Sequence, residues 1–288
     1  MRAIAVAFAL LILSLVRAQE TVPDVIYDKE EGCAFTLDVY KPKTPNHKAI
    51  VWIESFEWYS FSGLDPDFAK KFTDRGFTFF EVFHGSRPRF TVVDSIPMAM
   101  RAIRFIRSKA TSFGIDPDAI GVCGASSGGN LALDIGCFAG DGVATSRNPI
   151  DRVSDRANAI VAFFAPSDFL NWGGKGITPL DTLGKPRTIY PAFGITALKP
   201  EATMREIGHD TSPIYFIRHG FPPTLLIHGD TDKVVPLQQS VEFDKALEAA
   251  SIDHKLVILK GLGYADDTID KGLPQALDWF DQHLKVRY

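Results

Sequence analysis

Cysteine is scarce in this chain of 288 residues, which contains only Cys33, Cys123 and Cys137. An odd number of cysteines allows at most one internal bridge, so the chain is not a small disulfide scaffold. We expect Cys123 and Cys137 to be buried free thiols, because such thiols behave as small apolar side chains.

An excess of basic charge is also missing, since 31 Lys and Arg face 35 Asp and Glu and the formal net charge is -4. Without a general positive field, nucleic acid is not expected as a partner. No Cys/His cluster has the spacing of zinc ligands, and no glycine-rich phosphate loop with lysine occurs. We therefore predict no metal and no nucleotide or other cofactor. The 45 % of hydrophobic residues exclude a disordered or collagen-like chain.

Long apolar runs are limited to the N-terminus, where residues 4–16 are almost all apolar. This run is short for a membrane-spanning helix and is typical of a signal peptide, with cleavage after Ala18. The sequence thus predicts a signal peptide at 1–18 and a secreted or periplasmic mature protein. We expect no stable membrane insertion after cleavage, and association with a lipid surface remains an alternative. An uncleaved anchor, suggested by Arg17 beside the cut, and a buried N-terminal helix remain alternatives.

The rest of the chain alternates between short apolar segments and amphipathic ones. Strands are predicted at 33–40, 49–53, 77–83, 120–123, 159–164, 224–228 and 255–259, and helices at 65–76, 95–113, 128–138, 236–250 and 269–284. This alternation predicts a single α/β domain over 19–288, with a mostly parallel central sheet and helices on both faces. Residues 166–221, rich in Gly and Pro, are predicted to form a cap-like insertion over the carboxyl edge of the sheet, where open sheets bind ligands.

The sharpest motif is Gly-Ala-Ser-Ser-Gly-Gly at 124–129, placed between a predicted strand and a predicted helix. A serine on such a tight turn stands clear of the sheet, which predicts Ser126 as a nucleophile. The amide of Ser127, at the helix N-terminus, would then point toward an oxyanion formed beside it.

With this motif the sequence resembles the α/β-hydrolase fold, and within it the secreted bacterial esterase and lipase group related to hormone-sensitive lipases and feruloyl esterases. The approach to the serine strand at 114–122 and the His-Gly-Asp-Thr-Asp loop at 228–232 carry the resemblance further, over nearly the whole mature chain. The resemblance implies an acyl-enzyme on Ser126 and gives Asp232 the role of triad acid. Asp230 is its rival, and a capping role for Asp232 is the structural alternative.

Histidine is missing where the family places the catalytic base. The turn after the last predicted strand reads Lys-Gly-Leu-Gly-Tyr at 260–264, so Tyr264 stands at the histidine position. The side-chain pKa of tyrosine is near 10, against about 6.5 for histidine, so Tyr264 is a poor base at neutral pH. His84, after the predicted strand at 77–83, could act as a substitute base or could be an ordinary loop histidine.

Glycine is missing from the oxyanion loop as well. Relatives have His-Gly-Gly-Gly there, whereas this chain has Glu-Ser-Phe-Glu-Trp at 54–58. The candidate oxyanion donors are Ser127, Ser55 and Phe56, and the candidate substrate-binding residues are Trp58, His84 and Trp172.

These patterns predict an exported serine carboxylic-ester hydrolase-like protein whose incomplete triad and altered oxyanion loop leave weak activity or none. The expected partner is a small acyl or aryl ester, or an acylated saccharide; the saccharide rests on fold analogy. One alternative is a non-catalytic ligand- or carbohydrate-binding pseudo-esterase. The other is an active esterase that uses His84 as its base.

Overall fold

The computed structural model describes residues 20–61, 66–180, 189–195 and 200–287. The predicted signal peptide at 1–18 lies outside these residues. Among the described residues, no helix is both long enough and apolar enough to cross a membrane.

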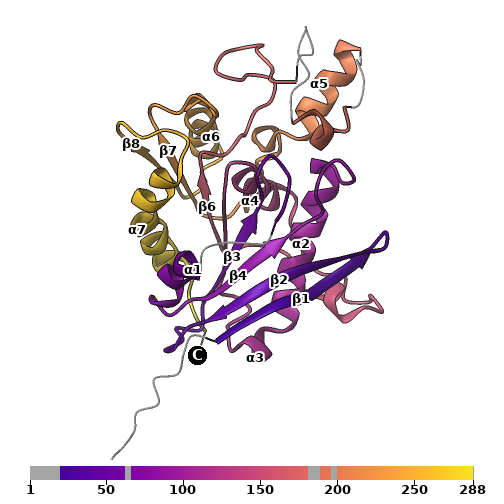
Figure 1. The fold of residues 1–288 in the computed structure, drawn as a ribbon, viewed down its shortest axis with the longest axis vertical. Coiled ribbons are helices and arrows are strands. Elements are labelled where there is room, and N and C mark those ends of the chain that lie inside the picture. The colour runs from indigo at the N-terminus through magenta and orange to yellow at the C-terminus, as the bar shows by residue number, and fades with distance from the viewer. Residues whose placement is uncertain (1–19, 62–65, 181–188, 196–199, 288) are drawn as a thin grey trace, which may run out of the picture.

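An eight-stranded sheet forms the centre of the molecule, in the order β1-β2-β4-β3-β5-β6-β7-β8 (Figure 1). The first three strands in this order pair antiparallel and all later neighbours pair parallel. The strands are β1 (Glu20–Glu30), β2 (Cys33–Lys41), β3 (Ala49–Glu54), β4 (Thr78–Phe83), β5 (Ile120–Ala125), β6 (Ala159–Phe163), β7 (Thr224–Gly229) and β8 (His254–Leu259). The central strands are buried on both faces, as their near-continuous apolar sequences predict.

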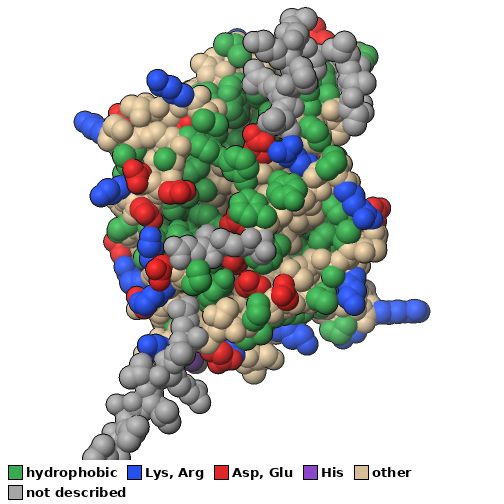
Figure 2. Space-filling view, viewed as in Figure 1, with side chains coloured by type: hydrophobic (Ala, Val, Ile, Leu, Met, Phe, Trp, Pro, Cys, Tyr) green, Lys and Arg blue, Asp and Glu red, His purple; other side chains and the backbone are tan. Residues whose placement is uncertain are grey.

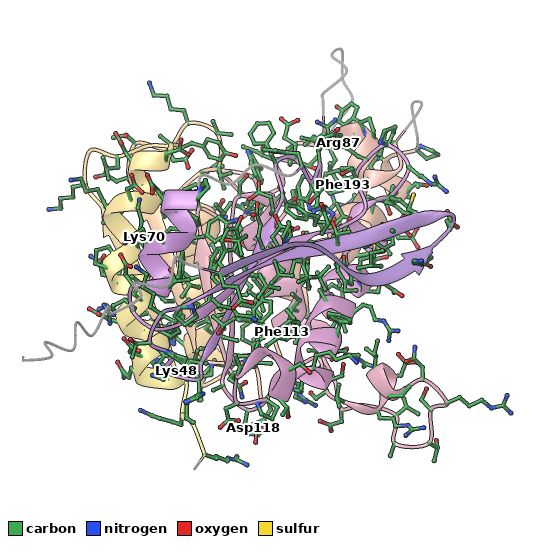
Figure 3. All side chains as sticks on the ribbon, turned by 60° about the horizontal axis from the view of Figure 1, so that its bottom comes forward. Lys48, Lys70, Arg87, Phe113, Asp118 and Phe193 are labelled. Carbon is green, nitrogen blue, oxygen red and sulfur yellow. The ribbon has the colours of Figure 1, made fainter. Side chains whose placement is uncertain are left out.

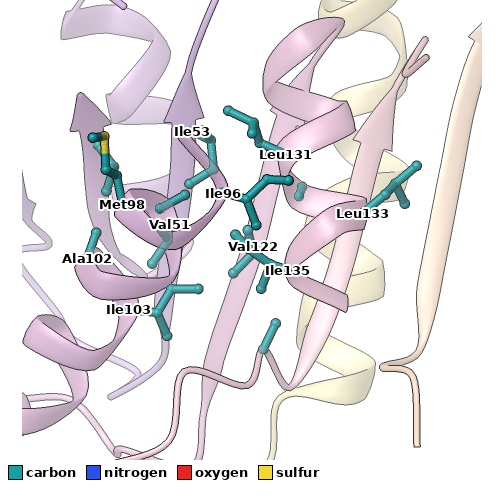
Figure 4. Close-up of a cluster of buried hydrophobic side chains, with 14 of the residues drawn as sticks. Val51, Ile53, Ile96, Met98, Ala102, Ile103, Val122, Leu131, Leu133 and Ile135 are labelled. Carbon is teal, nitrogen blue, oxygen red and sulfur yellow. The ribbon is translucent and has the colours of Figure 1, made fainter. Parts of the chain in front are cut away.

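Helices cover both faces of the sheet, in agreement with the predicted fold class. They are α1 (Pro66–Thr73), α2 (Val92–Ser108), α3 (Ala110–Phe113), α4 (Ser127–Phe138), α5 (Glu201–Asp210), α6 (Gln238–Ala249) and α7 (Asp266–His283), with 3-10 turns η1 (Pro149–Arg152), η2 (Tyr190–Phe193) and η3 (Pro213–Phe216). The larger apolar cluster lies between the sheet and α2, α4 and α6, and the smaller one lies under α1 and α7. Figure 4 shows α2 and α4 packing over strand residues such as Val51, Ile53 and Val122.

Two elements differ from the sequence prediction. The edge strand β1 was not predicted, because Pro23 and four acidic residues hide its alternation and two register shifts interrupt its pairing with β2. The predicted helix at 95–113 starts earlier, at Val92, since Thr91 and Asp94 form a capping box, and Lys109 separates α2 from α3.

The carboxyl ends of the parallel strands meet at one end of the molecule. Figure 1 shows this end at the top, with α5 beyond it. Figure 3 shows Arg87 and Phe193 at that end and Lys48 and Asp118, which precede β3 and β5, at the opposite end. The described parts of the 166–221 segment contain η2, α5 and η3.

Candidate active site

Ser126 occupies a strained turn between β5 and α4. Its φ of 54° and ψ of −120° lie outside the usual range for a side-chain-bearing residue, and its amide donates to the Phe163 carbonyl at 2.9 Å. A Cβ on Gly124 would lie 2.5 Å from the Gly128 carbonyl carbon, and one on Gly128 would lie 2.3 Å from the Ile53 carbonyl oxygen. These two glycines therefore let α4 start close against the sheet. Ser126, which stands at this turn, is half-buried.

The loop after β8 brings Tyr264 to Ser126. Asp230 accepts a hydrogen bond from the Gly261 amide at 2.7 Å, and the Thr231 amide donates to the Leu262 carbonyl at 2.9 Å. These bonds join the loop after β7 to the loop after β8 at the carboxyl edge. Asp230, the rival acid, is thus a residue that holds the two loops together.

The Tyr264 hydroxyl stands in an environment that keeps its proton. Burial raises the pKa of the phenol, and the nearby charges of Asp232, Glu57 and Asp266 raise it further, while a hydrogen bond with the Ser126 side chain acts in the opposite direction. The ring packs 4.9 Å from that of Phe164. At neutral pH the phenol is therefore a neutral hydroxyl and not a base.

The two oxygens of Asp232 have different surroundings. Oδ1 accepts hydrogen bonds from the amides of Val234 at 2.8 Å and Val235 at 2.9 Å, which is the capping role. Oδ2 is buried without a hydrogen-bond partner among the described residues, although His228 Nε2 lies 3.4 Å away. His228 Nε2 donates instead to the Val235 carbonyl at 2.9 Å, so Oδ2 has the vacant acceptor position that a triad histidine would use.

His228 itself is structural. Its Nδ1 lies 2.7 Å from the Ser240 hydroxyl and its Nε2 faces the Val235 carbonyl, so both ring nitrogens are engaged in the core. His228 therefore ties the end of β7 to the loop at Val235 and to Ser240 on α6.

The loop after β3 closes into a two-residue turn, which we call the Phe56–Tyr59 turn. The Phe56 amide donates to the Tyr59 carbonyl at 2.9 Å and the Tyr59 amide donates to the Phe56 carbonyl at 2.8 Å. Glu57 and Trp58 both have positive φ, 49° and 57°, in a turn that usually takes Asn and Gly. The Phe56 amide, predicted as an oxyanion donor, is thereby occupied within the turn.

Side chains tie this turn to its neighbours. The hydroxyls of Ser55 and Ser127 lie 3.0 Å apart, and Arg87 forms an ion pair with Glu57 at 2.8 Å. Trp58 is only 3 % exposed, and its indole nitrogen donates to Asn130 on α4 at 3.1 Å. The predicted substrate-binding role of Trp58 does not fit this burial, since its ring lies beneath the turn and away from the surface.

Trp58 belongs to an aromatic cluster with Phe169, Trp172 and Phe193, three residues of the 166–221 segment. Its ring lies 5.7 Å from that of Phe169 and 4.9 Å from that of Phe193. Trp172 stacks on the other side of Phe169, at 5.9 Å and 11° between the ring planes, and is half-buried. Of the predicted binding residues, Trp172 thus keeps part of its ring open to a ligand.

His84 is enclosed in the core. Only 4 % of the residue is exposed, Nδ1 lies 2.8 Å from the Gly85 carbonyl, and Nε2 has no hydrogen-bond partner among the described residues. Burial lowers the pKa of the imidazole to about 4, while the hydrogen bond with the Gly85 carbonyl acts in the opposite direction. His84 is therefore neutral at pH 7, and no hydrogen bond links it to Ser126.

Some residues that shape the site carry no clear sequence signal. Phe164, with a φ of 37°, supports Tyr264 directly after β6. Asn130 holds Trp58 and also donates to the Pro166 carbonyl at 3.2 Å. The Gly-Gly-Asn string at the start of α4 was the available hint for Asn130. In the described parts of the chain, no group of three or more His, Cys, Asp or Glu is arranged to hold a metal ion.

Comparison with known proteins places this geometry among esterases. Residues 37–247 match the BD-FAE family. The probable carboxylic ester hydrolase LipM of Mycobacterium tuberculosis (strain ATCC 25618 / H37Rv) is 27 % identical over 164 residues, which cover 57 % of this chain and 36 % of LipM. The probable isoprenylcysteine alpha-carbonyl methylesterase ICMEL1 of Arabidopsis thaliana is 24 % identical over 243 residues, 80 % of this chain and 48 % of the relative. The chain thus matches less than half the length of these two relatives.

Solved structures agree with this fold. A truncated carbohydrate esterase from gut microbiota has a TM-score of 0.76 and 25 % identity, covering 92 % of this chain and 96 % of its own. The esterase Est2 of Thermogutta terrifontis has a TM-score of 0.70 and 25 % identity, with 92 % of each chain covered. The bifunctional GH43-CE protein of Bacteroides eggerthii has a TM-score of 0.75 and 26 % identity, covering 92 % of this chain and 35 % of its own.

Proposed function

Since the chain belongs to the BD-FAE family of esterases with the α/β-hydrolase fold, we propose that it binds carboxylic esters at Ser126 and hydrolyses them only slowly. The observation that carries this proposal is the contact between Ser126 and Tyr264. Ser126, the proposed nucleophile on the strand-to-helix turn, has a neutral phenol as its neighbour, at the position where the family resemblance implies an imidazole.

Proton transfer is the part of ester hydrolysis that this site supports poorly. Ser126 Oγ attacks the carbonyl carbon, its proton leaves, and the ester C–O bond then breaks with the proton passing to the leaving alkoxide. Water repeats the sequence to release the acid. A triad histidine carries the proton in both halves, and losing that group costs on the order of 10⁶ in turnover. Tyr264 cannot carry it at neutral pH, because its raised pKa keeps the phenol protonated.

The oxyanion hole is weakened for a separate reason. The first amides of α4, including that of Ser127, have no acceptor within the helix and remain suited to an oxyanion. The Phe56 amide is occupied by Tyr59, and the negative charge of Glu57 contributes to the raised pKa of Tyr264. Losing one donor costs about 10² to 10³ in rate.

The proposed substrate is a small acyl or aryl ester, or an acylated saccharide. A structural neighbour named a carbohydrate esterase supports the saccharide. A pseudo-esterase that only binds its ligand is the second candidate, and the half-exposed Trp172 favours it. Catalysis through His84 is disfavoured by the enclosure of that ring.

The test is incubation with an activated aryl ester, followed by peptide mass spectrometry. We expect an acyl group to accumulate slowly on Ser126, because deacylation also needs the missing base. The Ser126→Ala variant is expected to give no adduct at this peptide. An adduct of equal yield on another residue, with Ser126 unmodified, would contradict the assignment of the nucleophile.

A further inference from the structure

A buried glutamine holds the first part of the loop after β6. Gln239, on α6, is wholly buried. Its Oε1 accepts hydrogen bonds from the amides of Ser167 at 2.8 Å and Asp168 at 2.7 Å. Its Nε2 donates to the carbonyls of Asp168 at 3.1 Å and Asn171 at 3.0 Å. Four backbone groups of one loop thus find their partner in a single side chain of another element.

The same loop closes on itself farther along the chain. We call residues 167–177 the Trp172 loop. The Trp172 amide donates to the Ile177 carbonyl at 2.7 Å, and the Gly176 amide donates to the side-chain oxygen of Asn171 at 2.8 Å. These bonds fix the backbone on both sides of Trp172, so the loop presents this side chain from a defined position.

The order of the strands places the Trp172 loop between two residues of the candidate site. β6 lies between β5 and β7, so the loop that follows it leaves the sheet between Ser126 and Asp232. The Gly173 amide donates to the Gln238 side chain at 3.0 Å, and a Cβ on Gly173 would lie 3.4 Å from the Pro236 ring. The Trp172 loop therefore packs directly against the end of the loop that carries Asp232.

The Trp172 ring is covered on one face and remains partly exposed. Phe169, itself 1 % exposed, stacks on it at 5.9 Å with 11° between the ring planes. Trp58, from the loop after β3, supports Phe169 in turn at 5.7 Å. Figure 2 shows hydrophobic side chains gathered at the top of this face, over the carboxyl ends of the strands and between α6 and α5. Trp172 is thus a rigidly backed ring in an apolar part of the surface.

A backed aromatic ring suits a ligand that has a flat apolar face and a polar rim, as a sugar ring does. We propose that Gln239 is a positioning residue of the Ser126 site, which holds Trp172 where its ring contacts a sugar ring in the alcohol part of the ester. This rests on the ester binding proposed above. Without the Gln239 amide, the four backbone groups would lose their partners, and the loop would have to move to reach water.

The experiment compares xylose tetraacetate with glycerol triacetate, which carries the same acetyl esters on an acyclic alcohol. Calorimetric titration of the Ser126→Ala protein gives the ratio of the two affinities without hydrolysis. Adding Trp172→Ala is expected to lower the preference for the sugar ester by about 5- to 20-fold, because the ring loses its apolar contact. Adding Gln239→Met, which keeps the length of the side chain but lacks the amide, is expected to lower it by about 3- to 10-fold.

A double substitution distinguishes positioning from a general loss of stability. Because Gln239 acts through Trp172, Gln239→Met combined with Trp172→Ala should lower the preference no further than Trp172→Ala alone. Asn158→Ala is the control, since it removes a side-chain hydrogen bond from the Ile120 amide, 3.0 Å long, at the amino ends of the strands. It should lower stability and leave the preference unchanged.

The outcomes separate this inference from the proposed function. An unchanged preference in Trp172→Ala would overturn the contact with the sugar ring. A double variant that loses clearly more than Trp172→Ala, or a Gln239→Met protein that binds both esters equally less tightly, would overturn the positioning role. Should Gln239→Met fold poorly, Gln239→Glu carries the test, because it keeps the acceptor for two amides, loses both donors and should lower the preference less.

Binding of neither ester is also decisive. If an activated aryl ester still acylates Ser126, that result would overturn the sugar contact and leave the proposed function standing. If Ser126 is not acylated either, the proposed function itself would be contradicted.

Discussion

The two oxygens of Asp232 have different surroundings, which separates its capping role from the triad role that the family resemblance implies. In a working triad the carboxylate orients a histidine, whereas here Oδ1 supports the turn at Val234 and Val235 and Oδ2 has no hydrogen-bond partner in the described chain. The two roles that the sequence suggests for Asp232 therefore concern different atoms: Oδ1 caps the turn, and Oδ2 is the atom that a triad histidine would contact. The presence of an aspartate at this position does not by itself indicate catalysis.

This division predicts a contrast between two substitutions. Asp232→Ala removes both amide hydrogen bonds and should lower the free energy of unfolding by about 1–3 kcal/mol. Asp232→Asn keeps an acceptor at Oδ1 and should change it by less than about 1 kcal/mol. Urea denaturation at pH 7 measures both. Equal losses for the two variants would show that the buried charge at Oδ2, and not the cap at Oδ1, is what the fold depends on.

At the scale of elements, the junction between β5 and α4 depends on Gly124 and Gly128, where a Cβ would clash with backbone atoms. The junction was predictable from the sequence, because a run of small residues between a buried strand and a helix indicates a tight strand-to-helix turn. The sequence did not show that the Phe56–Tyr59 turn would place Glu57 and Trp58 at positive φ, since propensity disfavours both there. Tertiary contacts with Asn130 and Arg87 hold that turn, and contacts of this kind are invisible in local sequence.

The junction gives a second prediction. Gly128→Ala places a Cβ 2.3 Å from the Ile53 carbonyl oxygen, so α4 must move and the free energy of unfolding should fall by about 1–3 kcal/mol. Gly140→Ala, just past α4, meets nothing within 4 Å and should change it by less than about 0.5 kcal/mol. Thermal or chemical denaturation of the two variants checks this. A tolerated Gly128→Ala would mean that α4 does not pack on β3 as described.

At the scale of the whole molecule, stability should depend on pH through Asp134 on α4. This carboxyl is fully buried, neither oxygen has a hydrogen-bond partner in the described chain, and burial raises its pKa well above the usual value. The folded protein thus holds the proton more tightly than the unfolded chain. Its contribution to stability is complete below about pH 4 and is lost as pH rises toward the folded-state pKa.

Asp134→Asn should therefore gain stability relative to the wild type as pH increases. Near pH 4 the protonated carboxyl and the amide are similar, so the two proteins should unfold at similar urea concentrations. By pH 8 the variant should be more stable by about 1–3 kcal/mol. A difference that stays constant between pH 4 and pH 8 would show that Asp134 does not change protonation on unfolding.

Export is a further prediction for the whole chain. We propose cleavage after Ala18, on the evidence of the apolar run at 4–16 alone. N-terminal sequencing of exported protein should give Gln19 as the first residue. Membrane-bound material that still begins at Met1 would favour the uncleaved anchor.

The central claim is that Tyr264, in place of a histidine, is the main limit on ester hydrolysis at Ser126. The most direct measurement is the pH dependence of aryl-ester hydrolysis by Tyr264→His. The introduced imidazole can reach Ser126 and give Asp232 Oδ2 its missing donor, so we expect turnover to rise by about 10- to 10³-fold, short of a full triad because the oxyanion loop is unchanged.

The pH profile should gain a limb near pH 6–7, and the rise should vanish in the Tyr264→His, Ser126→Ala double variant. A folded Tyr264→His protein that hydrolyses the ester at the parent rate, with no new limb, would contradict the claim.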